Sequence, residues 1–118
     1  MKTLTKAEED IMQELWNLKK ASVSMIIERL PEPKPAYNTV STIVRILENK
    51  GFIDHESKGR GYLYFPIIDK DTYSKFTTQK IADDYFAGSY KQMVSFFVNN
   101  ENLDLKDLEE IINRINKQ

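Results

Sequence analysis

Apolar residues recur every three or four positions over the first 30 residues, and this spacing predicts two amphipathic helices. The first helix begins at Thr5 and Glu8, a capping box in which a hydroxyl and a carboxylate satisfy free amides of the first turn. It ends near Leu18. Ser22 caps a second, shorter helix, which Pro31 stops.

A third helix is predicted within residues 37–51, after a stiff connector that contains three prolines in five residues. Its apolar stripe consists of Val40, Ile43, Val44 and Leu47. Gly51 provides the left-handed residue that ends such a helix. The opposite face is polar and contains Asn38, Thr39, Thr42, Arg45 and Asn49. This face is short and can donate or accept hydrogen bonds, with one acid, Glu48, near its C-terminal end.

Residues 52–56 and 61–65 are rich in aromatic and β-branched side chains at alternating positions, which predicts the two strands of a hairpin. The predicted tip, residues 57–60, carries Lys58 and Arg60 beside two glycines. Pro66 ends the second strand. The hairpin therefore presents two cations on a loop with little bulk around them.

Three more helices are predicted beyond the hairpin. One follows Asp69 and runs to about Phe86, one begins after Ser89, and the last begins after Asp104. The helix after Ser89 exposes a broad surface that is more apolar than one neighbouring helix could cover, so we expect a second copy of the chain to cover it. The expected dimer-interface residues are Phe86, Tyr90, Met93, Val94, Phe96, Phe97, Leu105, Leu108, Ile111, Ile112 and Ile115.

Three helices followed by a β-hairpin within about 65 residues is the order of a winged helix-turn-helix domain. We therefore expect a mostly α fold with a small β-hairpin. Residues 1–68 are expected to form a winged-helix DNA-binding domain, and residues 69–118 a helical dimerisation domain.

In such a domain the third helix enters the major groove of DNA and the wing lies against phosphate. Asn can read adenine, Arg can read guanine, and a Thr methyl can contact thymine. The expected DNA-binding residues are Lys34, Tyr37, Asn38, Thr39, Ser41, Thr42, Arg45, Lys50, Lys58 and Arg60. The alternatives are a solvated helix face and ordinary solubilising charges on the hairpin loop.

Composition narrows the function further. The 118 residues include no cysteine, which removes disulfides and thiolate metal sites, and only one histidine. His55 lies on a predicted strand without a second imidazole, so we expect no metal site, no cofactor and no enzymatic activity. No long apolar run or signal peptide is present, so no membrane insertion and a cytoplasmic location are expected.

The formal net charge of −1 is unusual for a DNA-binding protein. The charges are unevenly distributed along the chain. Residues 1–68 carry ten basic and nine acidic side chains, whereas residues 69–118 carry seven basic and nine acidic ones. The small positive excess therefore lies in the predicted DNA-binding part.

Four segments together resemble the BlaI/MecI/CopY family of bacterial winged-helix repressors. LTKAEEDIMQELW is similar to the family's opening helix, and YNTVSTIVRILENKGFI to its recognition helix and following strand. GRGYLYFPIIDKDTY is similar to its wing, and GSYKQMVSFFVNNENLDLKDLEEI to its dimerisation region. The resemblance extends nearly from end to end.

The resemblance implies a homodimeric repressor of a resistance or stress operon that binds a palindromic operator in double-stranded DNA. It also implies release of the operator after C-terminal cleavage, set off by a membrane metalloprotease sensor that responds to a signal such as a β-lactam, or by another signal. The family's Asn-Phe cleavage pair corresponds to Phe96-Phe97 in this chain. The cysteine cluster of the copper-responsive branch is missing, which excludes release by copper–thiolate chemistry. The alternative function is a winged-helix protein–protein interaction module without sequence-specific DNA binding.

Overall fold

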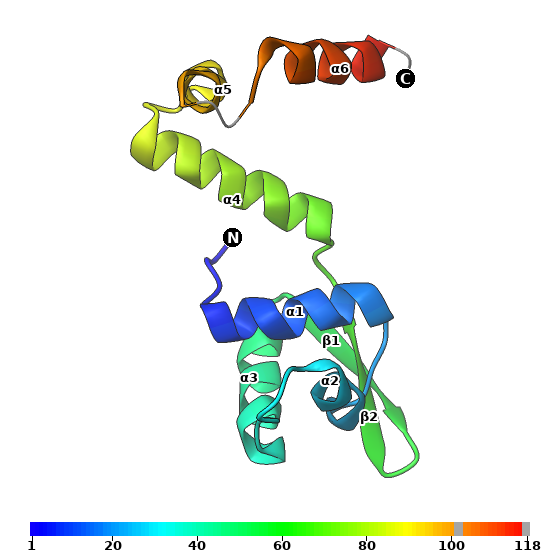
Figure 1. Cartoon of the computed structure of the whole chain (residues 1–118). Helices are drawn as coiled ribbons and strands as arrows, with labels where there is room; N and C mark the ends of the chain where they lie inside the picture. Colours follow the sequence, from blue (N-terminus) through cyan, green and yellow to red (C-terminus); the bar gives the residue numbers. More distant parts are fainter. Residues whose placement is uncertain (101–102, 117–118) are drawn as a thin grey trace. The chain divides into compact units, whose positions relative to one another are not determined.

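The fold is mostly helical with one β-hairpin, as predicted. A computed structural model describes residues 1–100 and 103–116 of the chain (Figure 1). The elements in chain order are α1 (Lys6–Leu18), α2 (Val23–Arg29), α3 (Tyr37–Asn49), β1 (Ile53–Lys58), β2 (Gly61–Pro66), α4 (Lys70–Tyr85), α5 (Tyr90–Asn99) and α6 (Leu105–Asn116). They divide into two compact units, residues 1–74 and residues 75–118.

The first unit has its core where α1, α2, α3 and the start of the hairpin meet. The largest fully buried side chains are Met12, Leu15, Ile26, Val40, Val44, Leu47, Phe52 and Ile53. Val40, Val44 and Leu47 belong to the stripe predicted for the third helix, so that prediction is confirmed. Burial of each such side chain contributes about 1.5 to 3 kcal/mol to the free energy of folding. This burial determines which face of α3 packs on the core and which polar face remains on the surface.

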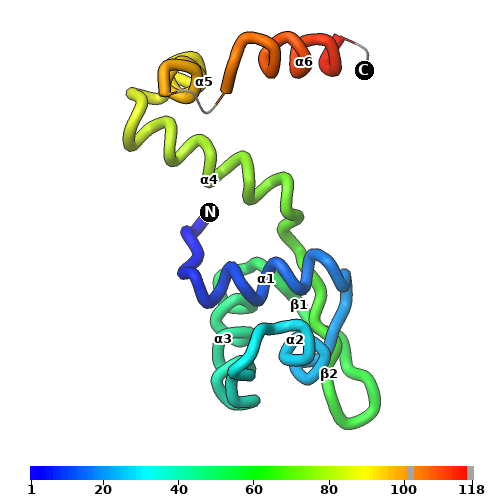
Figure 2. The backbone as a smooth tube through the Cα atoms, viewed as in Figure 1, coloured from blue at the N-terminus to red at the C-terminus, as the bar shows by residue number. Residues whose placement is uncertain are grey.

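Two predicted helix starts are confirmed by their hydrogen bonds. The Glu8 amide donates to Thr5 Oγ1 over 3.2 Å, and the Thr5 amide donates to Glu8 Oε1 over 2.7 Å, which completes the capping box of α1. The Met25 amide donates to Ser22 Oγ over 3.2 Å at the start of α2. Between α2 and α3 the proline-rich connector follows an open course, drawn in cyan in Figure 2.

The turn after α3 ties the hairpin to that helix. Gly51 adopts a φ of +82°, as the prediction of a left-handed stop required. The amide of Phe52 then donates to the Leu47 carbonyl over 3.0 Å. Because Phe52 and Ile53 are both buried, the first residues of the wing are anchored in the core of the unit.

The hairpin is longer and its tip shorter than predicted. Strands β1 and β2 pair antiparallel from Ile53 opposite Pro66 to Lys58 opposite Gly61. The predicted four-residue tip, residues 57–60, is therefore wrong, because Lys58 belongs to β1 and only residues 59 and 60 connect the strands. Gly59 has a φ of +60°, which lets the chain reverse within two residues.

The first turn of α4 belongs to the first unit. Asp69 caps it, since the Thr72 amide donates to Asp69 Oδ1 over 2.7 Å. Tyr73 is buried, its ring lies 5.4 Å from that of Phe52, and its hydroxyl accepts from the Leu4 amide over 2.9 Å. The functional division at residues 68 and 69 stays a prediction.

The second unit contains the rest of α4 with α5 and α6. Helix α4 ends before Ala87 and Gly88, which have φ values of +52° and +78°, close to the predicted end near Phe86. Ser89 Oγ accepts from the Gln92 amide over 3.1 Å and caps α5. At the start of α6 the Asp107 amide donates to Asp104 Oδ1 over 2.8 Å. Among the described residues, no helix combines the length and apolar character needed to cross a membrane.

Candidate nucleic-acid interface

A groove of about 700 Å³ lies in the first unit and is lined by α3, the wing and the start of α2. It brings together five residues that the sequence predicted to bind DNA. They are Tyr37, Ser41 and Arg45 on α3, and Lys58 and Arg60 on the wing. The groove therefore combines three cationic side chains with hydroxyl groups, the side-chain chemistry that contacts phosphate.

The exposed face of α3 places its polar side chains toward solvent. Asn38, Thr42 and Arg45 are all exposed. The Thr42 hydroxyl donates to the Asn38 carbonyl over 2.8 Å. Arg45 Nη2 donates to Ser41 Oγ over 3.3 Å, which uses one of the guanidinium's five N–H donors. This face suits base edges in the major groove, which present both donors and acceptors.

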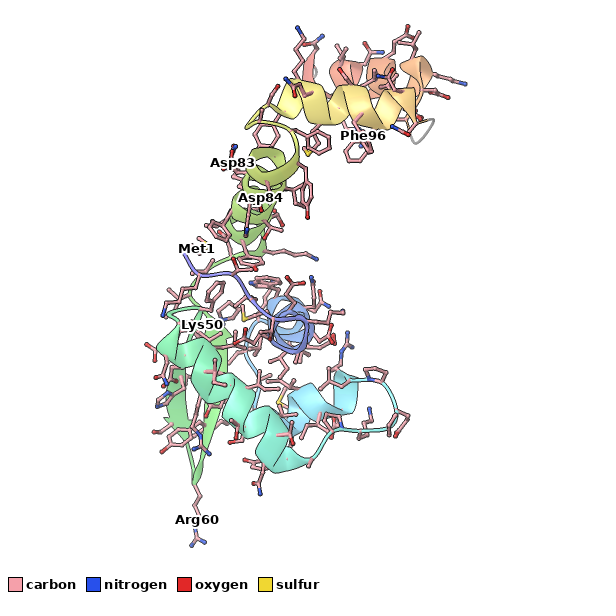
Figure 3. The ribbon with its side chains drawn as sticks, turned by 90° about the vertical axis from the view of Figure 1, so that its left-hand side faces the viewer. Met1, Lys50, Arg60, Asp83, Asp84 and Phe96 are labelled. Atoms are coloured by element: carbon pink, nitrogen blue, oxygen red, sulfur yellow. The ribbon has the colours of Figure 1, made fainter. Side chains whose placement is uncertain are left out.

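The wing carries its two cations in fixed places. Lys58 lies opposite Gly61 in the last pair of the ladder, and Arg60 lies in the two-residue turn beyond it. Figure 3 shows Arg60 at the end of the hairpin, extended away from the helices. The end of the hairpin thus contributes both charges to the lining of the groove.

Two other predicted phosphate contacts are engaged within the protein. Lys34 Nζ donates to the carbonyls of Glu28 and Leu30, and so satisfies the C-terminal end of α2. Lys50 Nζ lies 2.7 Å from Glu8 Oε1, and both side chains are largely buried. Their phosphate contacts stay predictions, and the structure gives each lysine a role in the fold.

The remaining predicted residue, Thr39, lines a different pocket. This pocket of about 260 Å³ lies between α1, α3 and the proline-rich connector, and Val40 and Ile43 also line it. Thr39 is exposed at its edge. Thr39 therefore belongs to the predicted polar face but does not line the groove.

Reasoning from the sequence missed four polar residues of the groove, Ser22, Ser24, Tyr62 and Tyr64. Tyr62 and Tyr64 alternate along β2 and line the groove together, so the period of two in GYLYF was a signal that could have found Tyr62. Burial, and then the negative charge of Glu48, raises the pKa of Tyr64, so this phenol stays protonated at neutral pH. The two serines lie beside the hairpin because Ala21 pairs with Tyr64 in an isolated bridge.

The predicted dimer residues lie in the second unit and differ in exposure. Phe86 and Leu108 are half-buried, and Met93 is buried. The exposed ones are Tyr90, Val94, Phe96, Phe97, Leu105, Ile111, Ile112 and Ile115. The rings of Phe86 and Phe96 lie 5.4 Å apart, and those of Phe96 and Phe97 6.0 Å apart. The second unit therefore exposes many large apolar side chains on α5 and α6.

A three-helix unit with a wing, followed by further helices, defines the class as a winged-helix DNA-binding protein. The likeness to a solved structure is direct. The first part of the chain is similar to the structure described as the solution structure of the DNA binding domain of the repressor BlaI, with a TM-score of 0.53 and 27% identity. That likeness covers 62% of this chain and 94% of the other.

The chain belongs to the penicillinase repressor family, whose model matches residues 4–117. It is 28% identical over 116 residues to the methicillin resistance regulatory protein MecI of Staphylococcus aureus, which covers 98% of this chain and 94% of that protein. It is 24% identical over 109 residues to the penicillinase repressor of Bacillus licheniformis, which covers 92% and 85%. The resemblance inferred from the four segments is confirmed, and the family is one of non-enzymatic transcriptional repressors.

Proposed function

We propose that the chain is a sequence-specific repressor that binds a palindromic operator as a homodimer. The observation that carries the proposal is the arrangement of the first unit, where Tyr37, Ser41 and Arg45 of α3 and the cations of the wing line one groove. A winged helix that binds DNA needs this arrangement, because the helix reads base edges while the wing holds the phosphate backbone.

In this proposal Arg45 reads a guanine and Asn38 an adenine, the pairings that their donors and acceptors favour. Lys58 and Arg60 contact phosphate and carry no sequence information. Tyr37 and Ser41, which line the same groove, add hydrogen bonds to the backbone. The base-reading and phosphate-binding residues thus come from different elements, which makes their contributions separable.

Dimerisation is supported by the exposed apolar side chains of α5 and α6. A monomer with a net charge of −1 makes few net favourable contacts with phosphate. Joining two DNA-binding domains in a dimer raises the effective concentration of the second domain at its half-site once the first is bound. Because a two-fold dimer presents the same surface twice, the operator should be a near-palindrome.

Any signal that separates the two subunits would release the operator. The proposal includes C-terminal proteolysis, set off by a membrane metalloprotease sensor, as one such signal. The bond between Phe96 and Phe97 lies inside α5, so a protease would require local unfolding of that helix. A different release signal stays an alternative under the same mechanism.

The test compares two substitutions in the groove, Arg45→Ala and Lys58→Ala, on a duplex selected from a random library. Arg45→Ala should weaken binding to the selected site by about 1 to 3 kcal/mol and relax the preference at one base pair. Lys58→Ala should weaken binding to selected and random duplexes alike and reduce the salt dependence.

Equal losses on selected and random duplexes for Arg45→Ala would contradict the base-reading role. Failure of the wild-type protein to enrich any sequence would contradict the proposal as a whole. The second candidate function is a protein-interaction module, which the net charge near zero supports. Such a module would enrich no DNA sequence from the library. The library experiment therefore distinguishes the two functions.

A further inference from the structure

We propose that Glu48, Asp54 and His55 form a binding site for a divalent transition-metal ion of the Zn²⁺ type. The sequence favoured no metal role for His55, because it is the only histidine in the chain. The fold brings two carboxylates to that imidazole, one of them from α3. One atom from each of the three side chains lies within 4.8 Å of the others.

The three side chains come from two elements joined by an anchored turn. Glu48 lies in the last turn of α3, and Asp54 and His55 lie at the start of β1. The chain between them is held by the buried side chains of Phe52 and Ile53. A metal ion would therefore find its ligands on a backbone that is already in place.

The donor atoms are suitable for such an ion. His55 Nδ1 lies 2.5 Å from Glu48 Oε1 and 4.0 Å from Asp54 Oδ1. Zn²⁺ binds imidazole nitrogen and carboxylate oxygen at about 2.0 to 2.2 Å, so ligand atoms around it lie roughly 3 to 4 Å apart. The present separations of 2.5 and 4.0 Å differ from that spacing, so binding of the ion requires small rotations of side chains that are exposed or half-buried. An imidazole ligand also favours Zn²⁺ or Ni²⁺ over Ca²⁺ or Mg²⁺.

Two aromatic rings of β2 lie beside the imidazole of His55. The ring of Tyr62 lies 4.7 Å away at 67°, and that of Tyr64 lies 5.8 Å away. The His55 amide donates to Asp54 Oδ1 over 2.8 Å, which orients that carboxylate. Nδ1 already faces the two acids in this arrangement, so part of the rotamer entropy that metal binding costs is already spent.

The local charge also calls for a cation. Among the ion pairs of the described residues, those of Glu48 and Asp54 have His55 as their partner. A protonated imidazole offsets only one of two carboxylate charges that lie this close together. A bound dication would offset both and would hold β1 of the wing to the end of α3.

The test uses the full chain without a histidine tag, stripped with a chelator and then titrated with ZnCl₂. Because the chain has one histidine, selective labelling with ¹⁵N-histidine gives the imidazole signals of His55 alone. We expect these signals to shift and to saturate at one Zn²⁺ per chain. Unmoved imidazole signals at stoichiometric Zn²⁺ would overturn the proposal.

Calorimetry on variants locates the other ligands. Loss of an outer partner of a metal ligand weakens binding about 10- to 100-fold, so loss of a direct ligand in E48Q should cost at least about tenfold. The matched control is Asp83→Asn with Asp84→Asn, which removes exposed carboxylates of α4 in the second unit (Figure 3). The control should bind Zn²⁺ like the wild type, and an equal loss in the control would overturn the site. Neither readout involves DNA, so the result is independent of the proposed repressor function.

Discussion

At the scale of single residues, the pair formed by Glu8 and Lys50 joins the start of α1 to the end of α3. Glu8 Oε1 accepts from Lys50 Nζ over 2.7 Å and from the Thr5 amide over the same distance. The carboxylate is buried, so its charge needs these partners. The pair fixes the C-terminal end of the helix that presents the polar face.

Replacing Lys50 with Met should destabilise the first unit. The substitution keeps the apolar stem and leaves a buried carboxylate without its cation, which should cost about 1 to 3 kcal/mol given the remaining capping bonds. Urea unfolding followed by the fluorescence of Trp16, the only tryptophan, measures this unit, because Trp16 Nε1 donates to the Ile68 carbonyl over 3.0 Å. Lys6→Met is the control, since Lys6 pairs with Asp10 on the surface. An equal loss in both variants would contradict the role of burial.

The same carboxylate predicts a pH dependence of stability. Burial raises the pKa of Glu8, but the hydrogen bonds from Lys50 and Thr5 outweigh it and leave the pKa below its ordinary value of 4.5. A lowered pKa in the folded state stabilises the fold above the unfolded pKa, and this contribution is lost as pH falls through the folded pKa. The stability difference between wild type and Glu8→Gln should therefore be constant near neutral pH and should shrink below pH 4.5. A difference independent of pH down to acid unfolding would contradict this assignment.

The sequence predicted the residues whose roles depend on near neighbours. Thr5 with Glu8 and Ser22 were assigned correctly, because a cap and its amide lie within three residues. Lys50 was predicted to contact phosphate, and its partner Glu8 lies 42 residues away, where no local spacing reveals it. Glu48 and His55 are only seven residues apart, but they belong to different elements, so no helical or strand spacing predicted their approach.

At the scale of elements, the turn between α3 and β1 determines where the wing begins. Gly51 has a φ of +82°, and a Cβ added there would meet nothing within 4 Å. Substitution at this position therefore changes backbone strain without a steric clash. A substitution at this position therefore measures only the conformational free-energy cost of placing a residue with a Cβ in the left-handed region.

Gly51→Ala should destabilise the first unit by about 1 to 2 kcal/mol, the cost of a left-handed conformation for a residue with a Cβ. Gly61→Ala is the matched control, because Gly61 has no positive φ and its added Cβ would lie 4.0 Å from the nearest atom, the Lys58 carbonyl oxygen. The control should be neutral in the same urea experiment. Equal destabilisation by both would show that loss of glycine, and not the φ angle, matters.

The helices were predicted within a residue or two, because caps, apolar periods and Gly or Pro stops are local signals. The hairpin tip was predicted two residues too long, since Ser57 and Lys58 are polar and give no sign of pairing. Their partners, Tyr62 and Gly61, set the ladder from the other strand. Which α3 residues line the groove and which line the smaller pocket also depends on how neighbouring elements pack against the helix. The helical period alone does not predict this packing.

At the scale of the whole molecule, the two compact units divide the chemistry between them. Residues 1–74 contain the groove with its cations, and residues 75–118 contain the exposed apolar side chains of α5 and α6. With a net charge of −1, the chain has little long-range electrostatic attraction for DNA. This attraction could not compensate if a single chain had to bind DNA without its partner. Affinity for an operator should therefore depend steeply on association of two chains.

Ile111→Asp combined with Ile115→Asp should give monomers, because both side chains are exposed on α6 and their burial between chains would leave two carboxylates without water. Sedimentation velocity at micromolar concentration measures the oligomeric state of the variant. The matched control is Lys106→Gln with Asn113→Asp, which changes the charge of α6 equally on the opposite face of the helix. The control should remain dimeric. The monomeric variant should also lose most of its affinity for a full operator but keep that for a half-site, whereas an unchanged dimer would remove α6 from the interface.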